Sequence, residues 1–340
     1  MHGSVQRHEP PGGGAALPGR GTARLPLIDM LHYPGSLHVT RDPLLPLVVA
    51  LLLSVVGSSF GVYAETPSAD RAATSTEAGS PLLLKAKQGQ IIYLKLQVEG
   101  QPVSVTGTFR DRRVPFFPVQ DSEFGALVGI DMTDQAKVGE LMAEITYPDR
   151  TSERRIHVRV VHEDFGEQRM TLPKDKVDLD AASLQRNALE QEKVKAVFAA
   201  FTSERLWSQA FIVPVDGIPM GAFGRKRFLN GQPRNQHSGE DISAALGTPV
   251  KASNAGLVKM VDDHFFSGLG VILDHGLGLY TMYFHLDSAK VKEGERVARG
   301  QIIGTVGQSG RATGPHLHWG AWLNGSRVNP FSLIKLPIEP

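Results

Sequence analysis

The sequence predicts a mainly β protein, made of an N-terminal β-sandwich, one connecting helix and a C-terminal all-β domain. Three observations support this prediction. Alternating apolar and polar runs fill residues 81–165, apolar residues return at three- and four-residue steps after Asp180, and glycines separate short apolar runs from Leu206 onward. A period of two is typical of strands, and a period near 3.6 is typical of a helix.

Composition narrows the class of protein. At 340 residues the chain is long enough for two folded domains and an export segment. Its formal net charge of +1 gives no support for nucleic acid as a partner. The chain has no cysteine, so any bound metal must be held by histidine and carboxylate side chains.

Residues 1–64 carry the features of an N-terminal extension with an export signal. Leu44–Val56 is an almost purely apolar run of 13 residues, shorter than the ~20 residues that a membrane span needs. Arg41 supplies a positive charge ahead of it, and Val62 and Ala64 occupy the two positions that a signal peptidase reads. We therefore expect a signal peptide cleaved after Ala64 and an exported protein, periplasmic or associated with the cell envelope. An uncleaved signal would tether the chain to the membrane.

Residues 65–80 are small and polar and predict a linker, whereas residues 81–165 predict a β-sandwich accessory domain of immunoglobulin-like architecture. Gly, Pro and Asp divide the latter region into about seven runs of strand length. His157 and His162 stand alone in it and are expected on the strand surface. The clearest runs are Ile91–Val98, Val103–Phe109, Leu127–Ile130, Glu140–Tyr147 and Arg155–Val161.

A connecting helix is predicted within residues 175–205. Asp180 is a suitable N-cap, and the Gln, Arg, Glu and Lys residues that follow give one polar, solvated face. We expect this helix to connect and space the two domains. The apolar positions that define its other face are Leu184, Ala188, Leu189, Val197, Phe198 and Phe201.

Residues 206–336 predict the second, all-β domain. Asn254–Gly256 separates the runs Pro249–Ser253 and Leu257–Val261, and this arrangement predicts a hairpin. Four further runs continue the series, at Val271–Asp274, Leu279–Phe284, Gln301–Val306 and His316–Leu323.

Histidines and one aspartate gather in this second domain. His316 and His318 stand two apart in an expected strand, so their imidazoles share one face while Leu317 points into the core. His237 and Asp241 stand four apart, and Gly239 between them argues against a helix, so we expect a loop that runs into a strand. These residues together predict a metal site.

Zinc suits such a set of side chains. Three nitrogen and oxygen ligands leave a fourth tetrahedral position for water, which is the arrangement of a catalytic zinc. Zinc lowers the pKa of bound water to about 7, so that hydroxide can attack a carbonyl at neutral pH. The remaining histidines would then move protons or stabilise the developing oxyanion.

Three motifs in this domain resemble those of the LytM/lysostaphin-type zinc metallopeptidases, family M23. They are His-Ser-Gly-Glu-Asp-Ile, Tyr-Phe-His-Leu and Gly-Pro-His-Leu-His-Trp-Gly, in the family's order, and the resemblance covers about residues 210–335. It implies a β-rich zinc metallopeptidase domain that hydrolyses peptide bonds in bacterial peptidoglycan, with its stem peptides and cross-links as partners.

The resemblance also implies roles for individual residues. His237, Asp241 and His318 match the zinc ligands. His285 and His316 match the catalytic pair, of which either could be the general base and either could stabilise the tetrahedral intermediate.

The chain departs from the family pattern at Glu240, where an aliphatic residue is usual. Glu240 could be a surface charge or a carboxylate behind the metal ligands, and the surface position is favoured. His275 matches a position where the family often has histidine, so it could bind substrate in the groove or have a structural role beside a turn. His264 has no match and is given no role.

The sandwich and helix resemble the accessory region of periplasmic family members. This likeness favours cleavage of a direct cross-link, between D-Ala and a diamino acid, over cleavage of glycine bridges. The alternative function is that of a non-catalytic activator of cell-wall amidases. Relatives with that function have lost zinc ligands, whereas this chain has the complete set.

Overall fold

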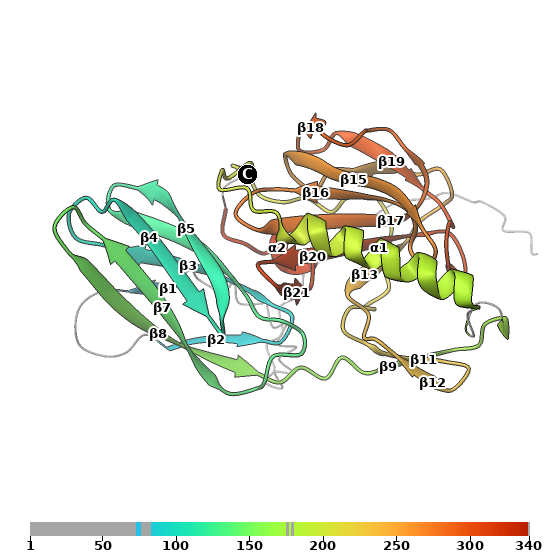
Figure 1. Ribbon diagram of the computed structural model, residues 1–340, viewed down its shortest axis with the longest axis horizontal. Coiled ribbons are helices and arrows are strands. Elements are labelled where there is room, and N and C mark those ends of the chain that lie inside the picture. The colour runs from blue at the N-terminus through green and yellow to red at the C-terminus, as the bar shows by residue number, and fades with distance from the viewer. Residues whose placement is uncertain (1–72, 76–82, 175–176, 178–179, 339–340) are drawn as a thin grey trace, which may run out of the picture. The chain divides into compact units, whose positions relative to one another are not determined.

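The structure is a computed structural model that describes residues 73–75, 83–174, 177 and 180–338. The predicted signal peptide lies outside the described residues, as does most of the predicted linker. Strands dominate the described chain (Figure 1), so the prediction of a mainly β protein is confirmed. Residues Glu65–Pro340 form one compact unit, and the division into domains at 165 and 206 stays a prediction.

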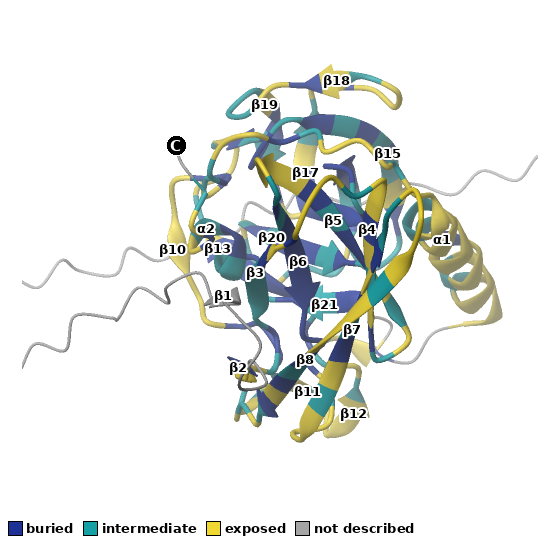
Figure 2. Ribbon diagram, turned by 90° about the vertical axis from the view of Figure 1, so that its left-hand side faces the viewer, coloured by how far each residue is buried: buried dark blue, intermediate teal, exposed yellow. Residues whose placement is uncertain are grey.

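The N-terminal half folds into the predicted sandwich. Its eight strands follow the order β1-β3-β6-β5-β4-β7-β8-β2. Strand β5 pairs with β4 up to Pro115 and with β6 from Phe116, so it belongs to both layers. Figure 2 shows the alternation of buried and exposed residues along β7 and β8. The strands are β1 Ala73–Ser75, β2 Leu83–Lys87, β3 Ile91–Gln97, β4 Ser104–Phe109, β5 Arg112–Gln120, β6 Glu123–Gly129, β7 Val138–Thr146 and β8 Thr151–Val161.

Helix α1 spans Ala181–Ala199 and begins where the sequence predicts. The Asp180 side chain accepts a hydrogen bond from the Ser183 N–H at 2.8 Å, which caps the first turn. The prediction of its apolar face was partly wrong, because Leu184 and Leu189 are exposed whereas Glu190 is buried. The reason is that the Glu190 carboxylate accepts hydrogen bonds from a backbone N–H of the second domain, described below.

The other end of α1 packs on the sheet of the second domain. Val194, Val197 and Phe198 lie against the buried residues Met260 and Tyr280, and the helix runs along this sheet in Figure 1. The helix therefore does more than space two domains, because it covers one face of the sheet that carries the histidines.

The second domain is built on a ten-stranded sheet. Its main path is β10-β13-β20-β17-β16-β15-β18, with β19 pairing β14 and β17, and β21 pairing β20. The strands are β10 Ile218–Pro219, β13 Gly239–Ser243, β14 Pro249–Lys251, β15 Gly256–His264, β16 Gly268–Asp274, β17 Leu279–Ala289, β18 Arg296–Val297, β19 Ile302–Val306, β20 His316–Leu323 and β21 Ser326–Val328, and helix α2 Phe331–Ile334 follows.

The predicted hairpin around Asn254 is wrong. Strand β14 pairs with β19, and β15 pairs with β16 and β18. The Asn254 side chain is buried, where it donates to the Gln209 carbonyl at 2.7 Å and accepts from the Ala255 N–H. The chain therefore passes through Asn254 from one partner strand to another instead of reversing on itself.

A three-stranded sheet beside the second domain was not predicted. It consists of β9 Glu167–Met170, β11 Lys226–Leu229 and β12 Gln232–Arg234, in the order β12-β11-β9. Strand β9 follows the sandwich and pairs in parallel with β11. These strands are short and polar, so their sequences lack the alternation that identifies the others.

The sandwich contacts the second domain at the Leu323 end of β20. Arg327 donates to both carboxylate oxygens of Asp131 through its side chain, at 3.1 and 2.9 Å, and Ser326 Oγ donates to the Gly129 carbonyl. Ser326 and Arg327 pair with Leu323 and Trp322 of β20. Because strand residues advance ~3.3 Å each, these contacts lie several residues along β20 from His316 and His318.

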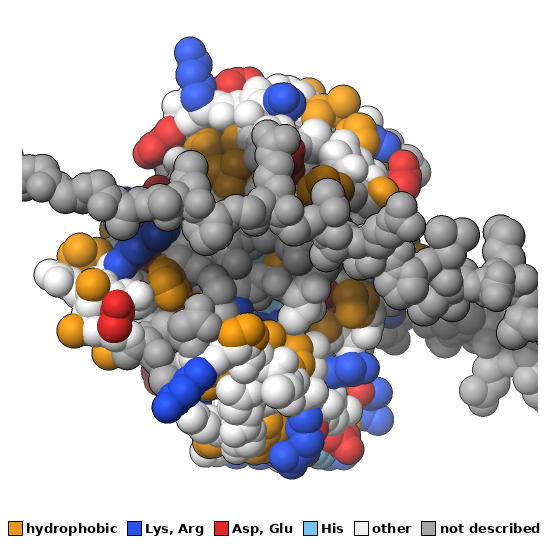
Figure 3. All heavy atoms as spheres, turned by 90° about the vertical axis from the view of Figure 1, so that its right-hand side faces the viewer, with side chains coloured by type: hydrophobic (Ala, Val, Ile, Leu, Met, Phe, Trp, Pro, Cys, Tyr) orange, Lys and Arg blue, Asp and Glu red, His pale blue; other side chains and the backbone are white. Residues whose placement is uncertain are grey.

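The described surface carries charges of both signs. In the view of Figure 3, Lys and Arg side chains (blue) are interspersed with Asp and Glu (red) and with hydrophobic residues (orange). Among the residues that the structure describes, neither helix combines the length and apolarity needed to cross a membrane.

Candidate metal centre

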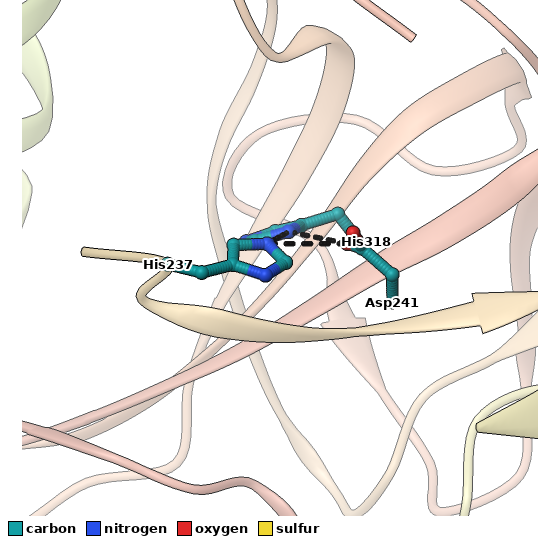
Figure 4. Close-up of side chains that lie close together, drawn as sticks. All are labelled: His237, Asp241 and His318. Carbon is teal, nitrogen blue, oxygen red and sulfur yellow. Dashed lines mark hydrogen bonds and ion pairs between the residues drawn. The ribbon is translucent and has the colours of Figure 1, made fainter. Parts of the chain in front are cut away.

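Strands β13 and β20 bring the predicted metal site together. They pair antiparallel with Asp241 opposite His318 and Ser243 opposite His316. His237 lies in the segment just before β13, so the site is a loop running into a strand. Figure 4 shows the side chains of His237, Asp241 and His318 pointing toward one another.

The three side chains offer ligand atoms that all lie within 4.8 Å of one another, and they could hold a metal ion. The Asp241 Oδ1 atom is 3.2 Å from His237 Nε2 and 2.9 Å from His318 Nδ1. The two imidazole nitrogens are 2.8 Å apart. Two imidazoles and one carboxylate with this convergence are a donor set that suits a divalent metal.

A backbone carbonyl fixes the orientation of the His237 ring. Its Nδ1 lies 3.1 Å from the Ala222 carbonyl oxygen, an acceptor, so Nδ1 carries the proton. Nε2 then bears the lone pair that faces Asp241 and His318. Backbone carbonyls hold metal-ligating histidines in this way in many metal sites.

Burial and hydrogen bonds set the charges that a metal ion requires. Burial lowers the pKa of His237, and it lowers the pKa of His318 to about 4, so both rings are neutral at neutral pH. Burial alone would raise the pKa of Asp241, but the imidazole rings of His237 and His318 that face the carboxylate outweigh burial and hold that pKa far below its usual range. The centre therefore presents two neutral imidazoles and one carboxylate anion, which are the forms that bind metal.

Arg227 stands behind the carboxylate. Its Nη2 lies 3.6 Å from Asp241 Oδ2, the oxygen turned away from the two imidazoles, and its Nε donates to Gln168 at 3.0 Å. Arg227 comes from β11 and Gln168 from β9, so the unpredicted small sheet supplies this charge. Sequence reasoning missed Arg227 because its strand carries no recognisable pattern.

His285 and His316 lie side by side next to the centre. Their ring centroids are 4.7 Å apart, and His316 Nε2 is 3.8 Å from Asp241 Oδ1. Each Nδ1 faces a backbone carbonyl at 2.8 Å, that of Ser309 for His285 and that of Gly314 for His316. Both rings therefore carry a proton on Nδ1 and an unprotonated Nε2 when neutral.

His285 is held in an uncommon backbone conformation. Its φ is 61°, a region that residues other than glycine seldom adopt. Burial, together with the nearby His318 and His316, lowers its pKa to about 3. Strained backbone and a strongly shifted pKa are typical of residues at functional sites.

The structure corrects the expected positions of two residues. His275 cannot line a groove, because it is fully buried and bonds through Nδ1 to the Ala255 carbonyl and through Nε2 to Thr281 Oγ1, both at 2.7 Å. Its predicted substrate contact is therefore wrong for this conformation. Glu240 is not on the surface, because it is buried behind the metal centre and bonded to backbone N–H groups.

The carbonyls that orient the histidines were also missed. Those of Ala222, Ser309 and Gly314 belong to the backbone, which every residue carries, so the sequence gives no signal for them. Only the glycines near them indicate close approach of the chain.

The all-β domain with a His–Asp–His cluster and two further histidines defines a metallopeptidase type of catalytic domain. Residues 235–330, which contain all of these side chains, match Peptidase family M23. The resemblance read from the three motifs is therefore confirmed for this part of the chain.

Relatives with assigned names match over the same part of the chain. The peptidoglycan DD-endopeptidase ShyA of Vibrio cholerae is 44% identical over 93 residues, which are 27% of this chain and 22% of that protein. The DD-carboxypeptidase/endopeptidase Mpg of Neisseria meningitidis is 44% identical over 101 residues, 30% of this chain and 23% of that protein. The chain thus spans under a quarter of the length of either relative.

One solved structure matches more than the catalytic domain. A peptidase M23 from Pseudomonas aeruginosa has a TM-score of 0.57 and 29% sequence identity. The match covers 76% of this chain and 96% of that chain. The fold similarity therefore extends beyond residues 235–330.

Proposed function

We propose that the protein is a zinc-dependent endopeptidase that hydrolyses peptide cross-links of bacterial peptidoglycan. The observation that carries this proposal is the pairing of His285 and His316, each oriented by a carbonyl, beside a centre made of His237, Asp241 and His318. The names of the relatives, peptidoglycan DD-endopeptidase and DD-carboxypeptidase/endopeptidase, support the same substrate class.

Zinc is the ion we propose for the centre. His237 Nε2, His318 Nδ1 and an Asp241 oxygen would hold it, and three protein ligands leave a position open, as in catalytic zinc sites. When bound, zinc acts as a Lewis acid and lowers the pKa of a coordinated water to about 7.

The proposed task of His285 and His316 is to handle protons and developing charge. Hydrolysis of a peptide bond requires a proton to leave the attacking water and another to reach the leaving amine. Because the Nδ1 atoms are committed to carbonyls, Nε2 is the atom on each ring that can accept or deliver a proton. One ring would serve as the general base while the other, once protonated, would stabilise the oxyanion.

Two finer proposals, on the cleaved bond and on the location of the protein, rest on the sequence and on the names of the relatives. We propose that the cleaved bond joins D-Ala to a diamino acid in a direct cross-link, in keeping with the names of the relatives. We also propose that the protein acts after export, in the periplasm or at the cell envelope, on the basis of Leu44–Val56 and the short residues at Val62 and Ala64.

Digestion of purified cross-linked peptidoglycan tests the proposal. The zinc-loaded protein should convert cross-linked fragments to uncross-linked ones, identified by their masses, and chelation of zinc should stop the conversion. If the zinc-loaded protein releases no fragments but stimulates a cell-wall amidase, the non-catalytic activator replaces the endopeptidase.

A further inference from the structure

A short segment ahead of β11 runs beside β13 and the residues just before it, and backbone hydrogen bonds join the two at both ends of the segment. The Met220 N–H donates to the Asp241 carbonyl at 2.9 Å, and the Gly224 N–H donates to the His237 carbonyl at 2.7 Å. Residues 220–224 are not themselves in a strand. Their remaining N–H groups are near the metal centre and need acceptors, because a buried N–H without one is costly.

Glu240 supplies these acceptors. Its carboxylate is buried, with Oε1 accepting from the Ala222 N–H at 2.7 Å and Oε2 accepting from the Phe223 N–H at 3.3 Å. Successive residues of a strand point to opposite faces. Asp241 therefore points to the metal centre, and Glu240 points away from it toward this segment.

Ala222 links Glu240 to a metal ligand. Its N–H donates to Glu240, and its carbonyl accepts from His237 Nδ1 at 3.1 Å. If the segment moved, the carbonyl would no longer hold the Nδ1 proton. His237 could then rotate or place its proton on Nε2, the atom that must be unprotonated to bind metal.

The segment also packs against Phe165, which follows the sandwich. Phe223 packs edge-on against Phe165, with ring centroids 5.6 Å apart. A Cβ on Gly224 would lie 2.3 Å from the Phe165 ring, so only glycine fits there. Phe165 and Glu240 thus both contact residues 222–224.

We propose that Glu240 is a positioning residue for the metal ligand His237, which it holds through the Ala222–Phe223 backbone. Its carboxylate fixes the Ala222 carbonyl, which in turn fixes the tautomer and ring orientation of His237. The inference rests on the metal-binding part of the proposed function and is independent of which bond is cleaved.

A purely structural role predicts a different outcome. Burial raises the pKa of Glu240 and the backbone N–H groups oppose that rise, so the carboxylate is held at a cost. If Glu240 only stabilised the fold, its loss would lower the free energy of unfolding and leave metal affinity unchanged in the folded protein. A positioning residue must change both metal affinity and the state of His237.

The test compares zinc affinity in the full chain of wild type and Glu240→Gln, by competition with a chromophoric chelator under conditions where circular dichroism shows both folded. Glutamine keeps the size and one acceptor but turns an N–H₂ donor toward a backbone N–H. We expect zinc to bind about 10- to 100-fold more weakly, as for other groups that orient metal ligands. The matched control is Glu123→Gln, which alters a buried strand carboxylate in the sandwich, paired with Lys95 at 2.9 Å, and should bind zinc as the wild type does.

A second measurement reports the tautomer of His237 directly, and its wild-type arm needs no variant. Nitrogen NMR of the zinc-free wild type should find His237 as the Nδ1–H tautomer, and Glu240→Gln should show a mixture of tautomers. Unchanged zinc affinity in Glu240→Gln, or an Nε2–H tautomer in the wild type, overturns the inference. A wild type that binds zinc normally but fails to cut peptidoglycan contradicts the proposed function and leaves this inference intact.

Discussion

A side chain on Gly239 would occupy the space of His318. A Cβ built on Gly239 would lie 2.5 Å from His318 Nε2 and 2.7 Å from the Trp319 carbonyl oxygen. Both are closer than real Cβ contacts. The glycine of the His-Ser-Gly-Glu-Asp motif is therefore needed so that the metal ligand on β20 can lie against the backbone of β13.

Gly239→Ala should consequently weaken metal binding. The added methyl group must push His318 away from His237 and Asp241, and we expect a loss of zinc affinity of at least about tenfold, similar to the effect of disturbing a group that orients a ligand. Competition with a chelator measures it. Gly314→Ala is the control, because a Cβ there meets no other atom within 4 Å. Equal affinities in the two variants would contradict this steric argument.

Removing a predicted ligand should remove the metal. His237→Ala, Asp241→Ala and His318→Ala each leave two ligands of three, so we expect bound zinc well below one ion per chain by metal analysis. His275→Ala should keep its zinc, because both ring nitrogens of His275 bond elsewhere. Full occupancy in His318→Ala would show that the ligand assignment is wrong.

Removing one of the catalytic pair should separate turnover from metal binding. His285→Ala and His316→Ala should retain zinc and lose about 100- to 10,000-fold in turnover, the usual cost of a missing acid–base group. Because the pKa of His285 is lowered to about 3, that ring stays neutral at neutral pH and its loss should not move the pH profile there. Turnover at the wild-type rate with zinc bound would exclude a catalytic role for the altered histidine.

The fold class and the metal site were predictable because their signals are local. The alternation of His316 and His318 around Leu317 is set by strand geometry alone. The buried face of α1 was not predictable, because the N–H that Glu190 binds belongs to Phe265, 75 residues away. Partners that lie so far apart in the sequence decide which residues are buried and which strands pair, and no pattern within the helix encodes them.

This contact makes Glu190 a test of what α1 contributes. Both carboxylate oxygens of Glu190 accept from the Phe265 N–H at 3.0 Å. Two residues further along the same turn, the Ser267 carbonyl accepts from the His285 N–H at 2.9 Å. Glu190→Ala leaves a part-buried donor without its carboxylate partner, so the free energy of unfolding should fall by about 1–3 kcal/mol. Because the turn that supports His285 loosens, turnover should fall as well, with zinc retained.

Chemical denaturation and peptidoglycan hydrolysis measure the two effects. Glu192→Ala is the control on the same helix, since the Glu192 side chain is exposed and pairs only at 3.7 Å with Lys195. A Glu190→Ala protein with wild-type stability would mean that the hydrogen bonds between Glu190 and Phe265 do not help to hold α1.

The buried His275 should make the fold sensitive to acid. Burial lowers its pKa from 6.5 to about 4, so between these values the unfolded chain binds a proton that the folded chain excludes. The stability that His275 contributes is therefore complete above pH 6.5 and is lost as the pH falls toward 4, by at most about 3 kcal/mol. His275→Gln removes the group that takes up this proton on unfolding. Denaturation of the zinc-free proteins should thus show a flatter decline with falling pH for His275→Gln than for the wild type or for a variant of the exposed His162. An equally steep decline in all three would mean that His275 is not held neutral in the fold.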